Sequence, residues 1–211
     1  MTAEDRFAQL PARRSKFFDT KFDWLKPLWN EPIIASLILV SILPVLVAVS
    51  ILVKLGSRGP ILYSQRRVGF NGKEFSIYKF RSMKMDAEAS SGPILAIKND
   101  NRITKVGRFL RASHLDELPQ IWNVINGDMA FLGPRPERMV FVNRYVKEIV
   151  NYNYRHSVKP GVTGLAQVCL PYDAKANDKL HYDLHYIGNK GSLNLNLFII
   201  WKTFQKVIKA F

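Results

Sequence analysis

One uncharged stretch of the chain, residues 33–53, constrains the fold more than any other feature. It reads IIASLILVSILPVLVAVSILV and has about the length that a helix needs to cross the hydrocarbon core of a bilayer. An apolar run of this length without a single charge is expensive to leave in water. The stretch therefore predicts a membrane-associated helix, and we place its boundaries at residues 33–55.

Two features of this segment argue against a simple transmembrane span. Pro44 lies near its middle, three residues after Ser41, and a proline there removes a helix hydrogen bond and clashes with the preceding turn. Both flanks are also basic. Lys- and Arg-rich flanks favour the cytoplasmic side, so a full crossing would put one of them on the wrong side of the membrane. A helix–break–helix that enters one leaflet and returns satisfies both flanks, so we expect a re-entrant helix broken near Pro44. One kinked span and a buried soluble helix are the alternatives.

Two further segments have the composition of helices that lie at the lipid headgroups. The leader, residues 1–32, combines basic and aromatic residues, most densely over residues 17–29. Residues 193–211 likewise interleave aromatic and aliphatic residues with lysines. Such helices bury an apolar face at the membrane interface and keep their cations in water. We expect both segments to be interfacial, with packing on the domain's own core as the alternative.

The charge balance limits the partners. Lys and Arg number 31 against 17 Asp and Glu, a formal net charge of +14. This excess indicates a polyanionic partner, which is nucleic acid, an anionic membrane surface or a phosphorylated substrate. The single cysteine, Cys169, excludes an intramolecular disulfide and a cysteine-based zinc site, and it fits a reducing compartment.

From Gly56 the composition becomes soluble and mixed, so we expect residues 56–211 to form one domain that carries the C-terminal interfacial helix. Alternating apolar residues around Asn71-Gly72 predict a β-hairpin within residues 59–83. Apolar residues at helical spacing predict helices over 118–125, closed by Gly127, and over 137–152 and 173–187. Turn and helix-breaking residues predict loops over 86–101 and 158–168. The expected fold class is mixed α/β, mostly helical with a small β-hairpin or sheet.

Two adjacent carboxylates, Asp116 and Glu117, are the strongest candidates for chemistry. Pro119 is tolerated only in the first turn of a helix, which predicts a helix start near Asp116. The free N–H groups there favour an ionised carboxylate. Such a carboxylate can attack phosphorus or carbon, or bind magnesium, while Glu117 shares the metal or transfers a proton. The alternative is a capped helix start followed by a solvated glutamate.

Cationic residues surround this pair in the sequence. Lys79 and Arg81 alternate at the end of a predicted strand and so share one of its faces. A basic stripe follows at helical spacing, made of Arg102, Lys105, Arg108 and Arg111. Pro134-Arg135-Pro136 then holds an arginine between two rigid residues at a predicted helix start. Each cation alone is typical of a solvated surface, but together with two carboxylates they suit a magnesium-dependent enzyme that acts on a pyrophosphate.

His181 and His185 are four residues apart on a predicted helix, with Asp183 between them. This spacing occurs in zinc sites, but the glutamate of the HExxH pattern is missing and no third ligand is evident. We therefore do not expect a metal there.

Four stretches resemble, in order, the motifs of the bacterial sugar transferases of the monotopic phosphoglycosyl transferase type. They are GPILYSQRRVGFNGKEFSIYKFRSM, NDNRITKVGRFLRASHLDELPQIWNVINGDMAFLGPRPE, RHSVKPGVTGLAQV and YDLHYIGNKGSLNLNLFIIWKTF, which cover most of residues 59–204. The break at Pro44 also resembles the re-entrant helix of that family. Asn196 departs from the family pattern, which usually has Asp at this position.

The resemblance implies a reaction. A sugar-1-phosphate moves from a UDP-sugar to polyprenyl (undecaprenyl) phosphate, and UMP is released, at the start of exopolysaccharide, O-antigen or other glycan assembly. Asp116 stands at the position of the nucleophile that forms a covalent phosphosugar–aspartyl intermediate, with Glu117 as its partner and Mg²⁺ bridging both to the diphosphate. Gln120 and Asn123 would orient the pair. Contacts to the phosphates or the nucleotide are implied for Lys79, Arg81, Arg108, Arg111 and Arg135.

The resemblance also implies a place in the cell and a set of partners. The chain would lie in the bacterial cytoplasmic (inner) membrane with its catalytic domain on the cytoplasmic face. We expect a UDP-sugar, polyprenyl phosphate and membrane lipids as partners; a homo-oligomer is compatible with the sequence. Nucleic acid is not expected, because Asp116 and Glu117 within the basic stripe would repel a phosphate backbone. The alternative function is a membrane-tethered basic binding or scaffold protein without catalysis.

Overall fold

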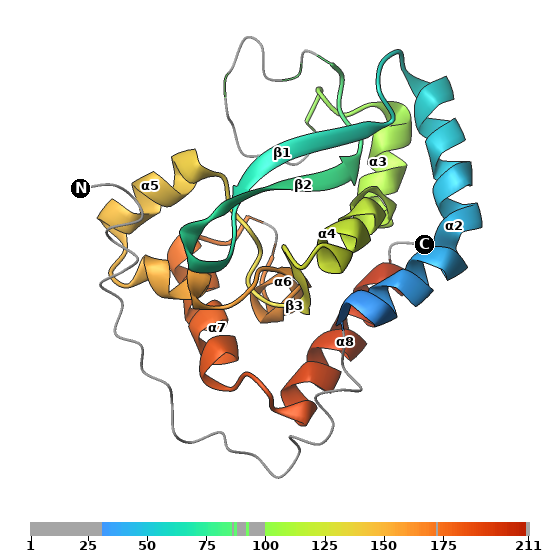
Figure 1. The fold of residues 1–211 in the computed structure, drawn as a ribbon. Coiled ribbons are helices and arrows are strands. Elements are labelled where there is room, and N and C mark those ends of the chain that lie inside the picture. Colours follow the sequence, from blue (N-terminus) through green and yellow to red (C-terminus); the bar gives the residue numbers. More distant parts are fainter. Residues whose placement is uncertain (1–30, 86, 88–91, 93–99, 172, 210–211) are drawn as a thin grey trace.

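A computed structural model of the 211-residue chain describes residues 31–85, 87, 92, 100–171 and 173–209 (Figure 1). The expected interfacial leader and most of the predicted 86–101 loop lie outside these residues. The described elements confirm a mixed, mostly helical fold. They are α2 (Glu31–Gly56), β1 (Leu62–Val68), η2 (Phe70–Gly72), β2 (Glu74–Phe80), α3 (Lys105–Ala112), η3 (Leu115–Gln120), α4 (Ile121–Ile125), β3 (Ala130–Leu132), α5 (Met139–Glu148), η4 (Tyr152–Ser157), β4 (Gly161–Thr163), α6 (Leu165–Cys169), α7 (Ala176–Gly188) and α8 (Leu193–Ile208), where η marks a 3-10 turn.

The predicted β-hairpin is confirmed. Strands β1 and β2 pair antiparallel, with Leu62 opposite Phe80 and Val68 opposite Glu74. The connection lies at Asn71-Gly72, where both residues have positive φ, 52° and 75°. This is the backbone conformation that Asn and Gly tolerate best, so the turn chemistry sets the register of the hairpin.

The interpretation of residues 158–168 as irregular was wrong. They contain β4, which pairs in parallel with β3, and most of α6. The glycines there permit close backbone contact and do not interrupt the elements. A Cβ on Gly161 would overlap the backbone nitrogen of Gly133, and one on Gly164 would overlap its carbonyl oxygen. Only glycine fits at such an approach of two backbones.

The three predicted helices are present with shifted boundaries. Residues 118–125 form the end of η3 and then α4, and Gly127 follows with φ 80°. The helix expected over 137–152 is the shorter α5, and the one expected over 173–187 is α7. In Figure 1, α2 lies along one side of the molecule next to α3 and α4, while α5 and α7 lie on the other side of the hairpin.

Helix α2 is the one helix of the described residues that is long and apolar enough to cross a membrane. It is a single 26-residue helix, so the expected helix–break–helix is corrected to one helix that bends (Figure 1). Pro44 has no N–H to donate to the preceding turn. The hydroxyl of Ser41 donates to the carbonyl of Leu37 at 2.9 Å, a contact that also bends helices.

One face of α2 packs against the domain on both sides of Pro44. Before the proline, this face contacts Phe75 and Ile77 of β2 together with α4, and after it the face contacts Phe80 and Leu110. The packed residues recur every three or four positions and are Ala35, Leu39, Ile42, Leu46, Val49 and Val53. The remaining faces expose large apolar side chains, from Ile33 to Leu55. The helix therefore covers the core and presents an apolar outer surface.

Both ends of α2 are fastened to the domain by hydrogen bonds. At the start, the Glu31 carboxylate accepts from the N–H of Phe131 in β3 at 3.2 Å. At the end, the Arg81 guanidinium donates to the carbonyls of Ser57 (2.7 Å), Arg58 (2.9 Å) and Val53 (3.4 Å). A cation over the free carbonyls of a helix end is favourable.

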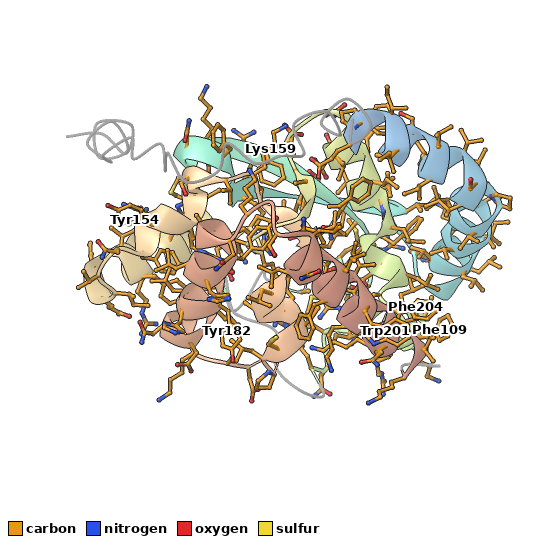
Figure 2. The ribbon with its side chains drawn as sticks, turned by 90° about the horizontal axis from the view of Figure 1, so that it is seen from below. Phe109, Tyr154, Lys159, Tyr182, Trp201 and Phe204 are labelled. Atoms are coloured by element: carbon orange, nitrogen blue, oxygen red, sulfur yellow. The ribbon has the colours of Figure 1, made fainter. Side chains whose placement is uncertain are left out.

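Helix α8 has one face against the domain and an opposite face that carries exposed apolar side chains. Its inner face carries the buried Ile199, a hydroxyl pair between Thr203 and Thr163 at 2.8 Å, and Lys206, whose Nζ donates to the Gln167 carbonyl at 2.6 Å. Its outer face exposes Leu197, Phe198, Ile200, Trp201, Phe204 and Ile208. Figure 2 labels Trp201 and Phe204 on α8, and both side chains are exposed. The helix thus packs on the core and still offers an apolar surface.

Candidate active site

Three segments that are far apart in the sequence meet at Glu117. Strand β2 brings Lys79, whose Nζ donates to Glu117 Oε1 at 2.5 Å. The segment before α5 brings Arg135, whose Nη2 donates to the same oxygen at 2.5 Å and whose Nη1 donates to Oε2 at 3.3 Å. The side chain of Glu117 is only 15% exposed. The attraction between a shielded carboxylate and two cations is strong, because little water screens the charges. The contacts bring together three of the predicted site residues.

A sharp turn after α3 presents the two carboxylates. His114 adopts the left-handed conformation, φ 57° and ψ 12°, which is uncommon for a residue with a side chain. The chain then forms η3, in which Leu115 and Leu118 pack into the core while Asp116 and Glu117 lie in the first turn. The predicted helix start is therefore a 3-10 turn, and Asp116 is its second residue, not its N-cap.

The environment separates the pKa values of the two carboxylates. Burial raises the pKa of Asp116 to about 6, and the charge of Glu117 acts in the same direction, against Lys79, Arg111 and Arg135. Burial opposes ionisation of Glu117 too, but Arg135 and Lys79 hold its pKa well below the usual range. The expectation that a helix start keeps Asp116 readily ionised is therefore corrected. Glu117 is the ionised partner, and Asp116 gains a proton below about pH 6.

This difference predicts a pH-dependent stability effect of Asp116→Asn. The native state holds the Asp116 proton more tightly than the unfolded chain, so the associated stability is complete below pH 3.8 and is lost as the pH rises through about 6. In EDTA, the Asn variant should melt above wild type at about pH 8, by about 2–4 °C for each kcal/mol relieved, and the gain should shrink at about pH 4.5. Thermal unfolding measures both; a gain that is larger at the lower pH would contradict the assignment.

The basic stripe divides in the structure. Arg111 lies close enough to influence the pKa of Asp116, and its Nε donates to Ser82 Oγ at 2.8 Å. Arg102 makes a two-pronged contact with Asp100, with its Nη2 2.6 Å from Oδ2 and its Nε 2.9 Å from Oδ1. Arg108 is exposed on α3. Arg81 is directed to the end of α2, a structural role, so substrate contacts by Arg81 and Arg108 stay predictions.

Asn123 supports the site from α4. Its side chain is fully buried; its Oδ1 accepts from Tyr78 N at 3.1 Å and its Nδ2 donates to Ser76 O at 2.7 Å. The amide therefore takes the place of a neighbouring strand beside β2 and fixes the backbone next to Lys79. Gln120 is 1% exposed, and its Nε2 has no hydrogen-bond partner among the described residues. An orienting role for Gln120 stays a prediction.

Sequence reasoning missed a buried ion pair behind Arg135. Arg155 donates to Asp183 Oδ2 at 2.8 and 3.0 Å, to the Tyr152 hydroxyl at 2.7 Å and to the carbonyl of Arg135 at 2.9 Å. His181 and His185, the pair considered for zinc, are both exposed on α7. The available signal was the place of Asp183 on the apolar face of α7, between Leu180 and Tyr186, because a charge there is usually paired.

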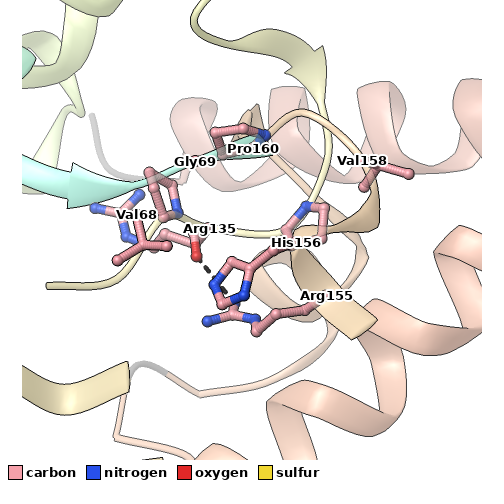
Figure 3. Close-up of a pocket in the computed structure, with 9 residues that line it drawn as sticks. Val68, Gly69, Arg135, Arg155, His156, Val158 and Pro160 are labelled. Atoms are coloured by element: carbon pink, nitrogen blue, oxygen red, sulfur yellow. Dashed lines mark hydrogen bonds between the residues drawn. The ribbon is translucent and has the colours of Figure 1, made fainter. Parts of the chain in front are cut away.

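A small cavity lies beside this ion pair, between Val68, Arg135, Arg155, His156 and Pro160 (Figure 3). Its volume is about 10 Å³, enough for roughly one water molecule and far too small for a nucleotide. Burial and the nearby Arg155 lower the pKa of His156 to about 3, so its imidazole is neutral at physiological pH. The cavity is therefore not a substrate pocket. It lies among the residues that support Arg135 from behind.

The carboxylates suit magnesium. Mg²⁺ commonly uses one or two protein carboxylates together with substrate phosphate oxygens, so two neighbouring carboxylates suffice. Among the described residues, no group of three His, Cys, Asp or Glu side chains forms a metal cage. The raised pKa of Asp116 favours a cation beside it, since added positive charge would offset burial and the charge of Glu117. Asp116 would then be the principal protein ligand, because Glu117 already binds Lys79 and Arg135.

Comparisons with known proteins place the sequence of this chain among those of a known family. A family model described as bacterial sugar transferase matches residues 24–210. A UDP-N-acetylgalactosamine-undecaprenyl-phosphate N-acetylgalactosaminephosphotransferase of Aeromonas hydrophila is 44% identical over 171 residues, which cover 80% of this chain and 40% of that protein. A UDP-glucose:undecaprenyl-phosphate glucose-1-phosphate transferase of Klebsiella pneumoniae is 44% identical over 182 residues, 84% of this chain and 39% of that protein.

A third relative is shorter. A putative undecaprenyl-phosphate N-acetylgalactosaminyl 1-phosphate transferase of Bacillus subtilis (strain 168) is 46% identical over 133 residues, which cover 63% of this chain and 70% of that protein. The chain thus spans about two fifths of the length of the Aeromonas and Klebsiella proteins. The likeness to those proteins concerns the part that contains the carboxylate pair and its cations.

Proposed function

The chain belongs to the bacterial sugar transferase family, and from this we propose that it transfers a sugar-1-phosphate from a UDP-sugar to undecaprenyl phosphate and releases UMP. The transfer initiates the synthesis of a membrane glycoconjugate. The names of the Aeromonas and Klebsiella relatives include a UDP-sugar and undecaprenyl phosphate, with different sugars. The observation that carries the proposal is the shielded pair Asp116–Glu117, in which Glu117 binds Lys79 and Arg135.

The transfer takes place in two displacements at one phosphorus. In the first, a carboxylate oxygen of Asp116 attacks the sugar-bearing phosphorus, an aspartyl O–P bond forms, and the bond to UMP breaks with its electron pair on UMP. In the second, an ionised oxygen of undecaprenyl phosphate attacks the same phosphorus. The aspartyl O–P bond breaks, which restores the Asp116 carboxylate and yields an undecaprenyl diphosphate sugar. No oxidant or additional proton donor is needed.

The cations make the first displacement feasible. A carboxylate and a diphosphate repel each other, so positive charge at the reaction centre is required. Lys79 and Arg135 provide it from fixed positions, because both are held by Glu117, and Arg111 adds a third cation near Asp116. Asp116, with Glu117 beside it, would hold Mg²⁺, and the ion would supply further neutralisation of the diphosphate charge.

The membrane contact holds this site at the headgroup plane, where the acceptor phosphate is found. Helix α2 is re-entrant: it enters the cytoplasmic leaflet of the inner membrane and returns. The support is that both ends and one whole face of α2 contact the same domain, although a straight span would carry one end away from it. The basic flanks agree, and the apolar outer face of α8 extends the contact to the interface.

Turnover in vitro tests the proposal. The purified full chain is incubated with Mg²⁺, undecaprenyl phosphate and, one at a time, UDP-glucose, UDP-galactose, UDP-N-acetylglucosamine or UDP-N-acetylgalactosamine, while UMP is followed. We expect sustained UMP release with at least one donor. The matched control omits undecaprenyl phosphate and should stop after about one turnover. A chain that binds undecaprenyl phosphate yet releases no UMP from any of these donors would instead be a binding or scaffold protein.

A further inference from the structure

The segment that carries Arg135 is held by other elements through its carbonyl groups. Residues 134–137 form neither helix nor strand, and two of the four are prolines without an N–H. Each of their carbonyls nevertheless accepts a hydrogen bond from another part of the fold. The donors are Gly161 N to Pro134 (3.0 Å), Arg155 Nη2 to Arg135 (2.9 Å), Arg67 Nη1 to Pro136 (3.1 Å) and Val68 N to Glu137 (2.8 Å).

Two of these four donors are arginine side chains that are fixed by further contacts. The Arg155 side chain is 4% exposed and is held by Asp183 and Tyr152. The Arg67 side chain is 20% exposed; its Nη2 donates to Gln65 Oε1 at 2.6 Å, and its Nη1 lies 3.6 Å from Glu137 Oε2. Figure 3 shows the contact from Arg155 to the carbonyl of Arg135. Each guanidinium group thus donates one hydrogen bond to this segment, and the two accepting carbonyls belong to neighbouring residues.

We propose that Arg67 and Arg155 are positioning residues, which hold the peptides of Arg135 and Pro136 so that the Arg135 guanidinium stays on Glu117. The inference rests on the proposed function, in which Arg135 and Glu117 act on the diphosphate. Because residue 136 is a proline, the peptide that bears the Arg135 carbonyl has no N–H, and that carbonyl is the group by which other elements can fix it. A guanidinium suits this task, since its planar fork binds a second partner without releasing the first.

The fixed peptide matters because the contact that it serves is short. Arg135 approaches Glu117 at 2.5 Å, and Glu117 also holds Lys79 at 2.5 Å. A drift of the Arg135 peptide would therefore disturb both cations at the reaction centre. Misplacement by about 1 Å can lower a rate by about 100-fold. Neither Arg67 nor Arg155 needs to touch a substrate to have this effect.

A double-mutant cycle tests the inference. Arg67→Gln is preferred to changes at Arg155, because Arg67 is less buried. We expect Arg67→Gln to lower kcat for UMP release by about 10- to 100-fold with little change in Tm. In an Arg135→Ala background, Arg67→Gln should lower the rate of UMP release, measured in single turnovers, by less than about 2-fold. Arg66→Gln is the matched control, since Arg66 is the adjacent residue and its side chain is 66% exposed; it should keep normal activity.

Two outcomes would overturn the inference: equal fold losses in both backgrounds, which indicate a general structural effect, or no loss from Arg67→Gln. Arg67→Lys is carried through the same cycle. Lysine keeps the charge beside Glu137 but lacks the forked guanidinium that binds two partners at once. This variant should show the same dependence on Arg135, so a folding defect of the Gln variant alone does not decide the result. Wild-type protein that releases no UMP refutes the proposed function, whereas active wild type with an unaffected Arg67→Gln refutes this inference alone.

Discussion

Asp116→Asn should lower the rate of UMP release by at least about 1,000-fold while the protein stays folded. The amide has the shape of the carboxylate, but it cannot form the aspartyl O–P bond on which both displacements depend. Folding should not suffer, since burial already raises the pKa of Asp116 and a neutral side chain suits that position. Initial rates of UMP release and thermal unfolding of the same samples measure the two effects.

The matched control for this change is Asp178→Asn, the same chemical substitution at an exposed position of α7. It should leave both the rate and Tm near wild type. An Asp116→Asn protein that works within about tenfold of wild type would contradict the assignment of the nucleophile. Loss of activity together with a large fall in Tm would contradict the electrostatic account of the site.

Asp183→Asn is expected to lower the free energy of unfolding by about 3–5 kcal/mol. The change leaves the Arg155 charge without its carboxylate, in a place where both side chains are less than 5% exposed. Chemical unfolding in detergent micelles, followed by tryptophan fluorescence, gives the midpoint and the slope for wild type and variant. The variant should unfold at a clearly lower denaturant concentration with a similar slope.

Glu148→Gln provides the comparison for this second change. It removes one partner of the exposed pair Arg144–Glu148 on α5, whose side chains are 69% and 50% exposed. Such an exposed helical pair contributes little to stability, because solvent screens its charges. Similar costs for Asp183→Asn and Glu148→Gln would show that the buried pair is not the support that the structure indicates.

The grouping of the two carboxylates with cations was predictable from local patterns. Asp116 and Glu117 stand out as two carboxylates within a basic stretch, and Pro134-Arg135-Pro136 marks an arginine with restricted backbone freedom. The structure brings Lys79 and Arg135 to Glu117 as that pattern indicates. The hairpin was equally accessible, because Asn71-Gly72 encodes its turn directly.

Other features depend on tertiary contacts that no local pattern contains. Period-two alternation placed Arg81 beside Lys79, but β2 ends at Phe80, so Arg81 leaves the strand and turns to the end of α2. The raised pKa of Asp116 follows from burial by distant elements. The run of residues 33–53 is apolar on every side, which hides the face that packs on the domain. Asp183 appeared to belong with two histidines, whereas its partner Arg155 is 28 residues away in the chain.

Intact-mass spectrometry of the protein after incubation with Mg²⁺ and an active UDP-sugar, without undecaprenyl phosphate, tests the central claim most directly. The account predicts that the mass increases by one sugar phosphate, that the adduct lies on the peptide containing Asp116, and that about one equivalent of UMP is released. Undecaprenyl phosphate should then remove the adduct, and Asp116→Asn should never acquire it. Full turnover by wild type with no adduct under any of these conditions, together with an active Asp116→Asn, would contradict the account.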